Sequence, residues 1–203
     1  MLFRSIIKRL PIRFTFDSNY FNDKYQGIPV DGYDKMFESM LDDIDVIVDE
    51  NYFDNKDHWD SMADKVVFTG KIDEYFNYEF GELEYRTLDF QHELLDTDNY
   101  QGVAMVNFPS LDVPWTRIVE HKHFTGVKTE KTIITREIPA VWNKDKVPYY
   151  PINDDKNTET FRKYREKADS LPNVIFGGRL SEYRYYDMHQ VIGSAMSTYK
   201  KHK

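Results

Sequence analysis

The sequence contains no cysteine among its 203 residues. This absence excludes disulfide bonds, thiolate metal sites and a cysteine nucleophile. There is also no run of about 18 apolar residues, the length that a membrane-spanning helix requires. The opening Met-Leu-Phe-Arg-Ser lacks the apolar stretch and small-residue cleavage site of a secretory signal. We therefore expect a cytoplasmic protein without a membrane span.

Positive charge is scarce as well. The chain has 27 lysine and arginine residues against 35 aspartate and glutamate residues, a formal net charge of −8. This balance argues against a general nucleic-acid binder, because such proteins present a basic surface. The apolar content of 40% and aromatic content of 16% argue against disorder, and the length suits one or two domains.

Short apolar runs near the beginning predict part of a parallel sheet. Val46–Val48 and Val66–Phe68 are continuous apolar runs, which are typical of strands buried on both faces. His58–Ala63 has helical character between them, and Gly32–Asp43 places its apolar residues at helical spacing. Together these segments predict an αβ unit.

A different pattern follows in the middle of the chain. Four segments alternate between apolar and polar residues and are separated by turn residues: Leu83–Phe90, Val103–Phe108, Thr116–Phe124 and Lys131–Ile138. This alternation predicts an antiparallel sheet, to which residues 12–16 add a strand. A charged helix is expected over Lys156–Ala168. The expected fold class is therefore mixed α/β, with parallel αβ pieces interleaved with an antiparallel sheet.

The segment 173–188 is the most informative stretch. An apolar strand, Val174–Phe176, leads into Gly177-Gly178-Arg179, and a helix is expected from Asp187 onward. Paired glycines let a planar ligand approach the backbone, because no side chain is in the way. The helix N-terminus beyond suits an anionic ligand atom. On these residues alone, however, such a turn is more often plain chain geometry.

This segment resembles the C-terminal flavin-binding stretch of the UDP-galactopyranose mutase family, where Gly-Gly-Arg-Leu, Glu-Tyr and Tyr-Tyr-Asp-Met occur together. Six further blocks match that family in the same order: Lys8–Asp17, Asn19–Asp23, Tyr25–Pro29, Leu83–Arg86, Arg117–Phe124 and Pro148–Asp154. The blocks span nearly the whole chain. The sequence is therefore identified as a member of this family.

The resemblance implies a flavin-dependent isomerase, an intramolecular transferase that uses reduced FAD to interconvert UDP-galactopyranose and UDP-galactofuranose for cell-surface polysaccharide synthesis. It also implies two domains. Residues 1–29 and 71–150 would form the antiparallel-sheet substrate domain. Residues 30–70 and 151–203 would form the C-terminal pieces of the FAD-binding αβ domain.

The same resemblance implies roles for individual residues. Arg9 and Arg117 match the arginines beside the flavin and the diphosphate, and we expect them to be catalytic. Five residues are expected to bind the substrate: Tyr20, Arg86, Tyr150, Tyr185 and Asp187. Four are expected to bind the flavin: Gly177, Gly178, Arg179 and the backbone of Met188. Without the family blocks, we would interpret the arginines as residues on a solvent-exposed strand face. The tyrosines would be interpreted as half-buried side chains with ordinary packing partners, and Asp187 as a helix N-cap.

Two histidines, His121 and His123, are expected to share one face of a strand. Two ligands without a third partner make a poor zinc site. We therefore expect no metal there and interpret both as residues of the sheet face.

One absence bears on the whole assignment. A flavoprotein of this kind seats the FAD pyrophosphate on Gly-x-Gly-x-x-Gly after a strand, and this sequence has no such motif. We expect the chain to be the C-terminal portion of the enzyme. The alternative is a non-catalytic fragment that needs the missing N-terminal half to bind FAD. Expected partners are UDP-galactose and either that half or a second copy in a homodimer. An amine-oxidase-type relative is disfavoured by the diphosphate-type arginines and tyrosines.

Overall fold

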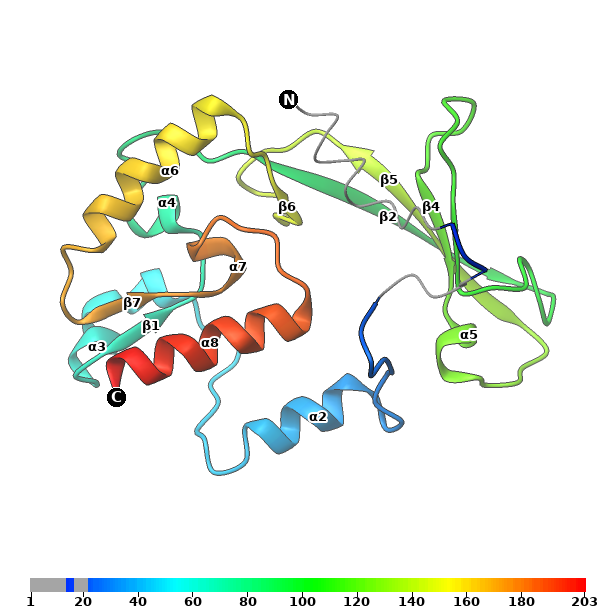
Figure 1. Cartoon of the computed structure of the whole chain (residues 1–203), viewed down its shortest axis with the longest axis horizontal. Coiled ribbons are helices and arrows are strands. Elements are labelled where there is room, and N and C mark those ends of the chain that lie inside the picture. The colour runs from blue at the N-terminus through cyan, green and yellow to red at the C-terminus, as the bar shows by residue number, and fades with distance from the viewer. Residues whose placement is uncertain (1–13, 17–21) are drawn as a thin grey trace. The chain divides into compact units, whose positions relative to one another are not determined.

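The computed structural model describes residues 14–16 and 22–203 (Figure 1). By its internal contacts the chain divides into two units, Met1–Val46 and Ile47–Lys203. The described part of the first unit contains the predicted helix as α2 (Gly32–Met40), which ends three residues earlier than expected. None of the described residues before Ile47 is buried, so the hydrophobic core lies in the second unit.

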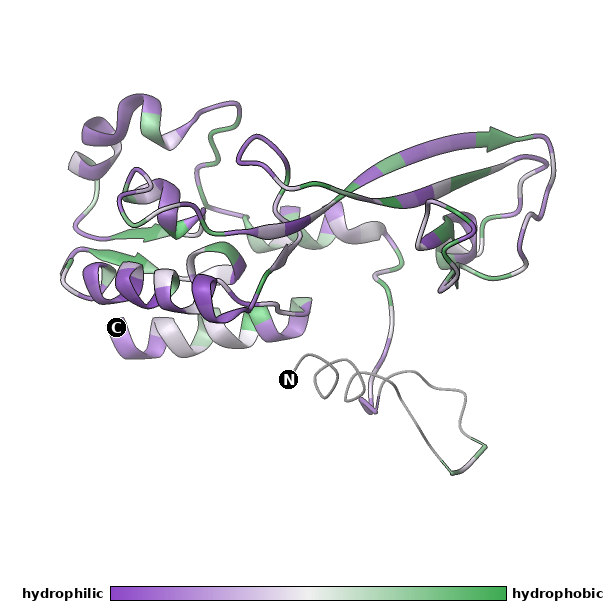
Figure 2. Ribbon diagram, turned by 90° about the horizontal axis from the view of Figure 1, so that it is seen from above, coloured by the Kyte–Doolittle hydropathy of each residue, from purple (hydrophilic) through white to green (hydrophobic). Residues whose placement is uncertain are grey.

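The second unit contains a parallel pair of strands flanked by helices. The strands β1 (Val66–Phe68) and β7 (Val174–Phe176) pair in register, Val66 opposite Val174. The surrounding helical elements are η1 (Tyr52–Asn55), α3 (Lys56–Ser61), α4 (Ile72–Tyr75), α6 (Asp155–Ala168), α7 (Gly178–Ser181) and α8 (Met188–His202). Both strands consist of apolar residues and are coloured as hydrophobic in Figure 2, although Val67 at the centre of β1 is exposed.

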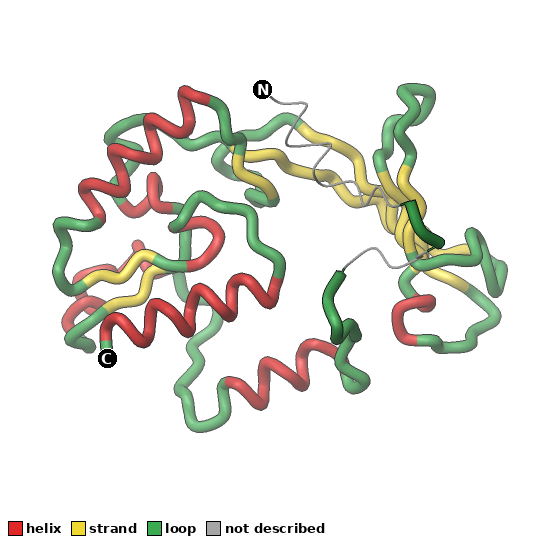
Figure 3. The backbone as a smooth tube through the Cα atoms, viewed as in Figure 1, coloured by secondary structure: helices red, strands yellow, loops and turns green. Residues whose placement is uncertain are grey.

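An antiparallel sheet occupies the middle of the chain (Figure 3). Its strand order is β3-β4-β5-β2-β6. The strands are β2 (Tyr85–Leu95), β3 (Met105–Asn107), β4 (Arg117–Glu120), β5 (Thr132–Ala140) and β6 (Tyr150–Pro151). The long strand β2 pairs with β5 from Thr87 onward and with β6 through Tyr85 and Arg86. The expected mixed α/β class, with parallel and antiparallel sheets, is confirmed.

The core of the second unit is rich in aromatic side chains. Its buried members are Phe68, Ile72, Leu83, Tyr85, Tyr164, Ala168, Phe176 and Tyr183. Burying one large apolar side chain contributes about 1.5–3 kcal/mol, so this cluster is the main stabilising feature of the unit. The hydroxyl of the fully buried Tyr164 donates to the Gly81 carbonyl at 2.8 Å and accepts from the Phe80 N–H at 2.9 Å.

Two expected strands are wrong. Val46–Val48 is an exposed loop, because an apolar run forms a strand only where another strand supplies the hydrogen bonds. The strand expected over Thr116–Phe124 ends at Glu120 and is followed by the short helix α5 (Lys122–Thr125). This helix stops at Gly126, which has the left-handed φ of 69° that glycine accommodates.

Other expectations fall partly outside what the structure describes. Residues 14–16 of the expected strand 12–16 are exposed and not in a strand, and the rest of it lies outside the described residues. The two interleaved domains remain a prediction. Among the described helices, none combines the length and the apolarity needed to cross a membrane.

Candidate functional site

Two of the predicted tyrosines meet face to face. The rings of Tyr150 and Tyr185 stack with centroids 5.5 Å apart and planes inclined by 30°. Tyr150 lies on β6, directly opposite Arg86 on β2. Tyr150 is 36% exposed and Tyr185 is 39% exposed, so solvent reaches part of both residues. Tertiary structure thus brings three of the predicted substrate-binding residues together.

Arg179 joins this cluster from the turn after β7. The turn needs glycine because Gly178 has a φ of 81°. The Arg179 guanidinium lies 5.8 Å from the centre of the Tyr185 ring, within cation–π range. Its Nη2 donates to the Tyr149 carbonyl oxygen. Its Nε is buried and has no hydrogen-bond partner among the residues that the structure describes.

Asp187 links the tyrosine pair to helix α8. It is the N-cap of α8 and forms a capping box with Gln190, whose side-chain oxygen accepts from the Asp187 N–H at 2.9 Å. Its Oδ1 accepts a hydrogen bond from the Tyr185 hydroxyl at 2.9 Å. Burial, and next this hydrogen bond, raise the pKa of Tyr185. The Tyr185 hydroxyl therefore keeps its proton at neutral pH and acts as a donor.

Two buried residues hold this arrangement in place. The Ser181 hydroxyl lies 2.9 Å from the Phe68 carbonyl oxygen and 2.8 Å from that of Gly70, which ties the turn to the end of β1. The Tyr183 hydroxyl accepts from the Ile152 N–H at 3.1 Å and donates to the Glu84 carbonyl. Sequence reasoning did not single out either residue, although both lie within the block that contains Arg179.

Arg117 is not part of the cluster. It begins β4, where its Nε donates to Asn107 Oδ1 at 3.0 Å and its Nη1 lies 3.5 Å from Glu137 Oε2. Arg117 pairs with Glu137, which pairs with Phe90 on β2. Arg86 shares that face of β2, about 13 Å further along the strand. The two predicted arginines thus lie on one face of the sheet but apart.

Several predicted residues lie elsewhere. Arg9 and Tyr20 are outside the described residues. The histidines do not share a strand face, because β4 ends at Glu120. His121 Nε2 lies 2.6 Å from Thr135 Oγ1, and His123 Nε2 lies 3.1 Å from Glu120 Oε2. Within the described ranges, no three histidine or acidic side chains lie together as a metal site requires.

The turn after β7 leaves open space beside its backbone for the predicted flavin ring. A Cβ built on Gly177 would meet nothing within 4 Å, so a flat ring can approach the backbone there. The unpartnered Arg179 Nε offers a buried donor, and Met188 opens α8 with 54% of its surface exposed. These residues fit one side of a flavin site. The sequence does not contain the Gly-x-Gly-x-x-Gly motif that seats a flavin pyrophosphate.

Comparison with known proteins gives consistent results. Residues 1–185 match the family model described as UDP-galactopyranose mutase. The chain is 38% identical over 198 residues to a dTDP-fucopyranose mutase of Escherichia coli and 39% identical over 196 residues to a probable UDP-galactopyranose mutase of Klebsiella pneumoniae. It is 36% identical over 212 residues to a UDP-galactopyranose mutase of Mycoplasma genitalium. These alignments cover 95–96% of this chain and 50–52% of the relatives, so the chain spans about half the length of the curated relatives that it matches.

Proposed function

The chain belongs to the UDP-galactopyranose mutase family, and from this premise we propose that it supplies the C-terminal portion of a flavin-dependent isomerase acting on UDP-galactopyranose. Two of the relatives, from Klebsiella pneumoniae and Mycoplasma genitalium, are named for this substrate. The reaction would interconvert the pyranose and furanose forms of the sugar. The expected cytoplasmic location and a possible homodimer are parts of the same proposal.

The observation that carries the proposal is the cluster of Arg86, Tyr150, Tyr185 and Arg179. These residues come from three separate segments and present guanidinium groups and phenol hydroxyls at an accessible place. Guanidinium groups pair well with phosphate oxygens, and charge-assisted hydrogen bonds are stronger than neutral ones. We assign the diphosphate of the nucleotide sugar to Arg86, Tyr150 and Tyr185 of this cluster, and Arg179 to the flavin.

The residues have distinct tasks in this proposal. Tyr150 and Tyr185 donate hydroxyl hydrogens to the diphosphate, for which Tyr185 exchanges its bond to Asp187. Arg117 lies apart from this cluster in its ion pair with Glu137 and, with Arg9, would neutralise negative charge beside the flavin. Asp187 orients Tyr185 and starts α8.

Gly177, Gly178, Arg179 and the Met188 N–H would hold one side of the FAD. When bound in its reduced form, this cofactor supplies the electron-rich centre that the ring interconversion needs. The open backbone at Gly177 and the unpartnered Arg179 Nε support this assignment.

Flavin retention tests whether this chain works alone. The purified chain is mixed with FAD, freed of unbound cofactor and examined for a flavin spectrum. We expect little retention, because the pyrophosphate loses its usual contacts when Gly-x-Gly-x-x-Gly is absent. Retention and activity should return when the part of the Klebsiella pneumoniae relative that this chain does not match is added. Stoichiometric binding by the isolated chain would refute the fragment interpretation.

Turnover of the reconstituted protein tests the site. Tyr150→Phe and Tyr185→Phe should each raise KM at least about tenfold, because each removes a hydrogen bond to a charged group. The matched control is Tyr199→Phe, since Tyr199 is 65% exposed on α8. Unchanged KM in both site variants would contradict the diphosphate assignment.

A second candidate substrate is dTDP-fucopyranose, because the Escherichia coli relative named for it is 38% identical to this chain. Both nucleotide sugars carry a diphosphate, which the cluster would bind in the same way. Side-by-side turnover of the two substrates by the reconstituted protein decides between them.

A further inference from the structure

Strand β6, which carries Tyr150, is very short. It consists of Tyr150 and Pro151 and pairs with two residues of β2, whereas strands usually have 3–10 residues. Proline has no N–H group, so the second residue of β6 donates no hydrogen bond to the sheet. Backbone pairing alone therefore holds this strand weakly, and the position of the Tyr150 ring depends on contacts from outside the sheet.

Two side chains from one segment hold the residues on either side of β6. Before the strand, the Arg179 Nη2 donates to the Tyr149 carbonyl oxygen. After it, the Tyr183 hydroxyl accepts from the Ile152 N–H at 3.1 Å. Arg179 lies in α7 and Tyr183 follows that helix by two residues, and Figure 1 labels α7 and β6 near each other. The segment around α7 therefore brackets the strand at both ends.

The Arg179 contact acts directly on the backbone of Tyr150. The Tyr149 carbonyl belongs to the peptide group that joins Tyr149 to Tyr150, and a peptide group is planar. Holding this oxygen therefore restricts the direction in which the Tyr150 side chain leaves the backbone. On its other side, the Tyr149 N–H donates to the Arg86 carbonyl oxygen at 3.1 Å, so the same residue is also tied to β2.

The Arg179 guanidinium also contacts the partner of Tyr150. It lies 5.8 Å from the centre of the Tyr185 ring, which stacks on Tyr150. Arginine suits this position because it stays charged at working pH and presents several donors in fixed directions. One nitrogen can hold the Tyr149 carbonyl while another remains available to a ligand. A single side chain thus constrains both members of the tyrosine pair.

We propose that Arg179, in addition to its proposed contact with the flavin, is a positioning residue for the diphosphate site and acts through Tyr150. It fixes the peptide group before Tyr150 and the ring of Tyr185, and thereby aims the Tyr150 hydroxyl at the diphosphate. The inference rests on the proposed function. It adds that the turn assigned to the flavin sets the geometry of the neighbouring diphosphate site.

Hydrogen exchange in the full 203-residue chain, without any ligand, tests the structural step. Arg179→Ala should speed exchange of the Tyr149 amide at least about tenfold, because β6 separates from β2 more often once its bracket is lost. The matched control is Arg184→Ala, since Arg184 is exposed in the same segment and the variant loses the same charge. Unchanged exchange in Arg179→Ala, or equal acceleration in both variants, would overturn the proposal.

A double-mutant cycle tests the functional step, with UDP as the probe. The chain is reconstituted with the unmatched part of the Klebsiella pneumoniae relative and kept free of flavin. Arg179→Ala should weaken UDP binding about tenfold in the unmodified background. In the Tyr150→Phe background it should weaken binding less than about threefold, because the hydroxyl through which Arg179 acts is already gone. Equal factors in both backgrounds would show that Arg179 acts independently of Tyr150.

The two measurements separate this inference from the proposed function. If the unmodified reconstituted protein does not bind UDP, the proposed function fails, and hydrogen exchange still decides whether Arg179 holds β6. If Arg179→Ala lowers flavin retention but leaves UDP affinity unchanged, Arg179 serves the flavin alone and the inference is refuted. Arg179→Met keeps an unbranched stem without a donor, and it replaces Arg179→Ala in both measurements if that variant does not fold.

Discussion

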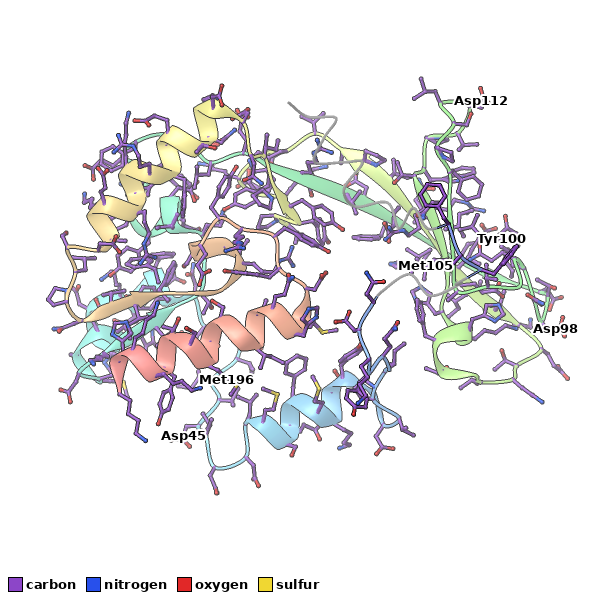
Figure 4. All side chains as sticks on the ribbon, in the orientation of Figure 1. Asp45, Asp98, Tyr100, Met105, Asp112 and Met196 are labelled. Atoms are coloured by element: carbon purple, nitrogen blue, oxygen red, sulfur yellow. The ribbon has the colours of Figure 1, made fainter. Side chains whose placement is uncertain are left out.

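Glu120 is a carboxylate with no exposed surface and several donors around it. It accepts hydrogen bonds from the Gln101 N–H at 2.9 Å, the Tyr100 N–H at 3.1 Å and the Thr132 hydroxyl at 2.8 Å. Burial by itself raises the pKa of a carboxyl group, but these hydrogen bonds outweigh it and lower the pKa of Glu120 to about 2. The residue fixes the loop before β3, where Figure 4 labels Tyr100.

Replacing this carboxylate should destabilise the chain. Glu120→Gln removes the charge and leaves backbone donors poorly paired, so the free energy of unfolding at pH 7 should fall by about 1–3 kcal/mol. Urea unfolding measures the change. The control is Glu130→Gln, because Glu130 is exposed. An equal loss in both variants would contradict a specific role for Glu120.

The same residue predicts a dependence on pH. Its pKa in the folded chain is about 2, below the ordinary value of 4.5, so its contribution to stability is complete above pH 4.5 and decreases as pH falls toward 2. The stability difference between the unmodified chain and Glu120→Gln should therefore shrink over this interval. Urea unfolding at pH 7, 4 and 3 checks the trend, and a constant difference would contradict it.

At the scale of elements, the stability of α8 depends on its N-cap residue, Asp187. Asp187→Ala removes the capping box with Gln190, which should lower the free energy of unfolding by about 1 kcal/mol. Asp187→Asn should lower the free energy of unfolding by only a few tenths of a kcal/mol, because asparagine caps helices as well as aspartate does. Thermal unfolding followed by helical circular dichroism measures both. If the two variants lose the same amount, capping is not the cause.

The Tyr183 hydroxyl joins two elements that are far apart in sequence. It connects the segment after α7 to Glu84, just before β2, and to Ile152, just after β6. The φ of Tyr183, 44°, is unusual for a residue other than glycine. Tyr183→Phe keeps the ring in the core but removes the hydroxyl that donates to the Glu84 carbonyl, while the Ile152 N–H keeps its bond to that carbonyl at 3.0 Å. The expected loss is about 0.5–1.5 kcal/mol in urea unfolding. The exposed Tyr199→Phe, as control, should lose almost nothing.

At the scale of the whole molecule, stability depends on the second unit, whereas the proposed chemistry also uses Arg9 and Tyr20 from the first. Every core residue of the cluster around Phe68 and Tyr164 lies in Ile47–Lys203. A truncated chain of residues 47–203 should therefore unfold within about 2 °C of the full chain. It should lose diphosphate binding once reconstituted, because Arg9 and Tyr20 are removed. A large drop in the unfolding midpoint would show that the first unit contributes to the core.

Residue patterns predicted the elements whose signals are local. The helical spacing of α2, the charged helix α6, the apolar runs of β1 and β7 and the Asp187 start of α8 all follow from neighbours in sequence. The predicted strand Val46–Val48 does not form, because a strand needs a pairing partner elsewhere in the chain and three apolar residues do not specify one. The prediction that β4 continues past Glu120 was wrong. The hydrogen bonds of the buried Glu120 and the left-handed Gly126 impose a turn there, and alternation of apolar and polar residues does not reveal it.

The sequence by itself determined the family, the mixed fold class and the residue types of the candidate site, because motifs and periodicity are properties of adjacent residues. Only the tertiary structure decided which of those residues meet. Tyr150 stacks on Tyr185 because β6 pairs with β2 and Tyr183 holds the turn after α7 against both strands. Arg117 stays apart, in an ion pair with Glu137, because strand register places it along the sheet. Register and long-range hydrogen bonds connect residues far apart in sequence, so no local pattern encodes them.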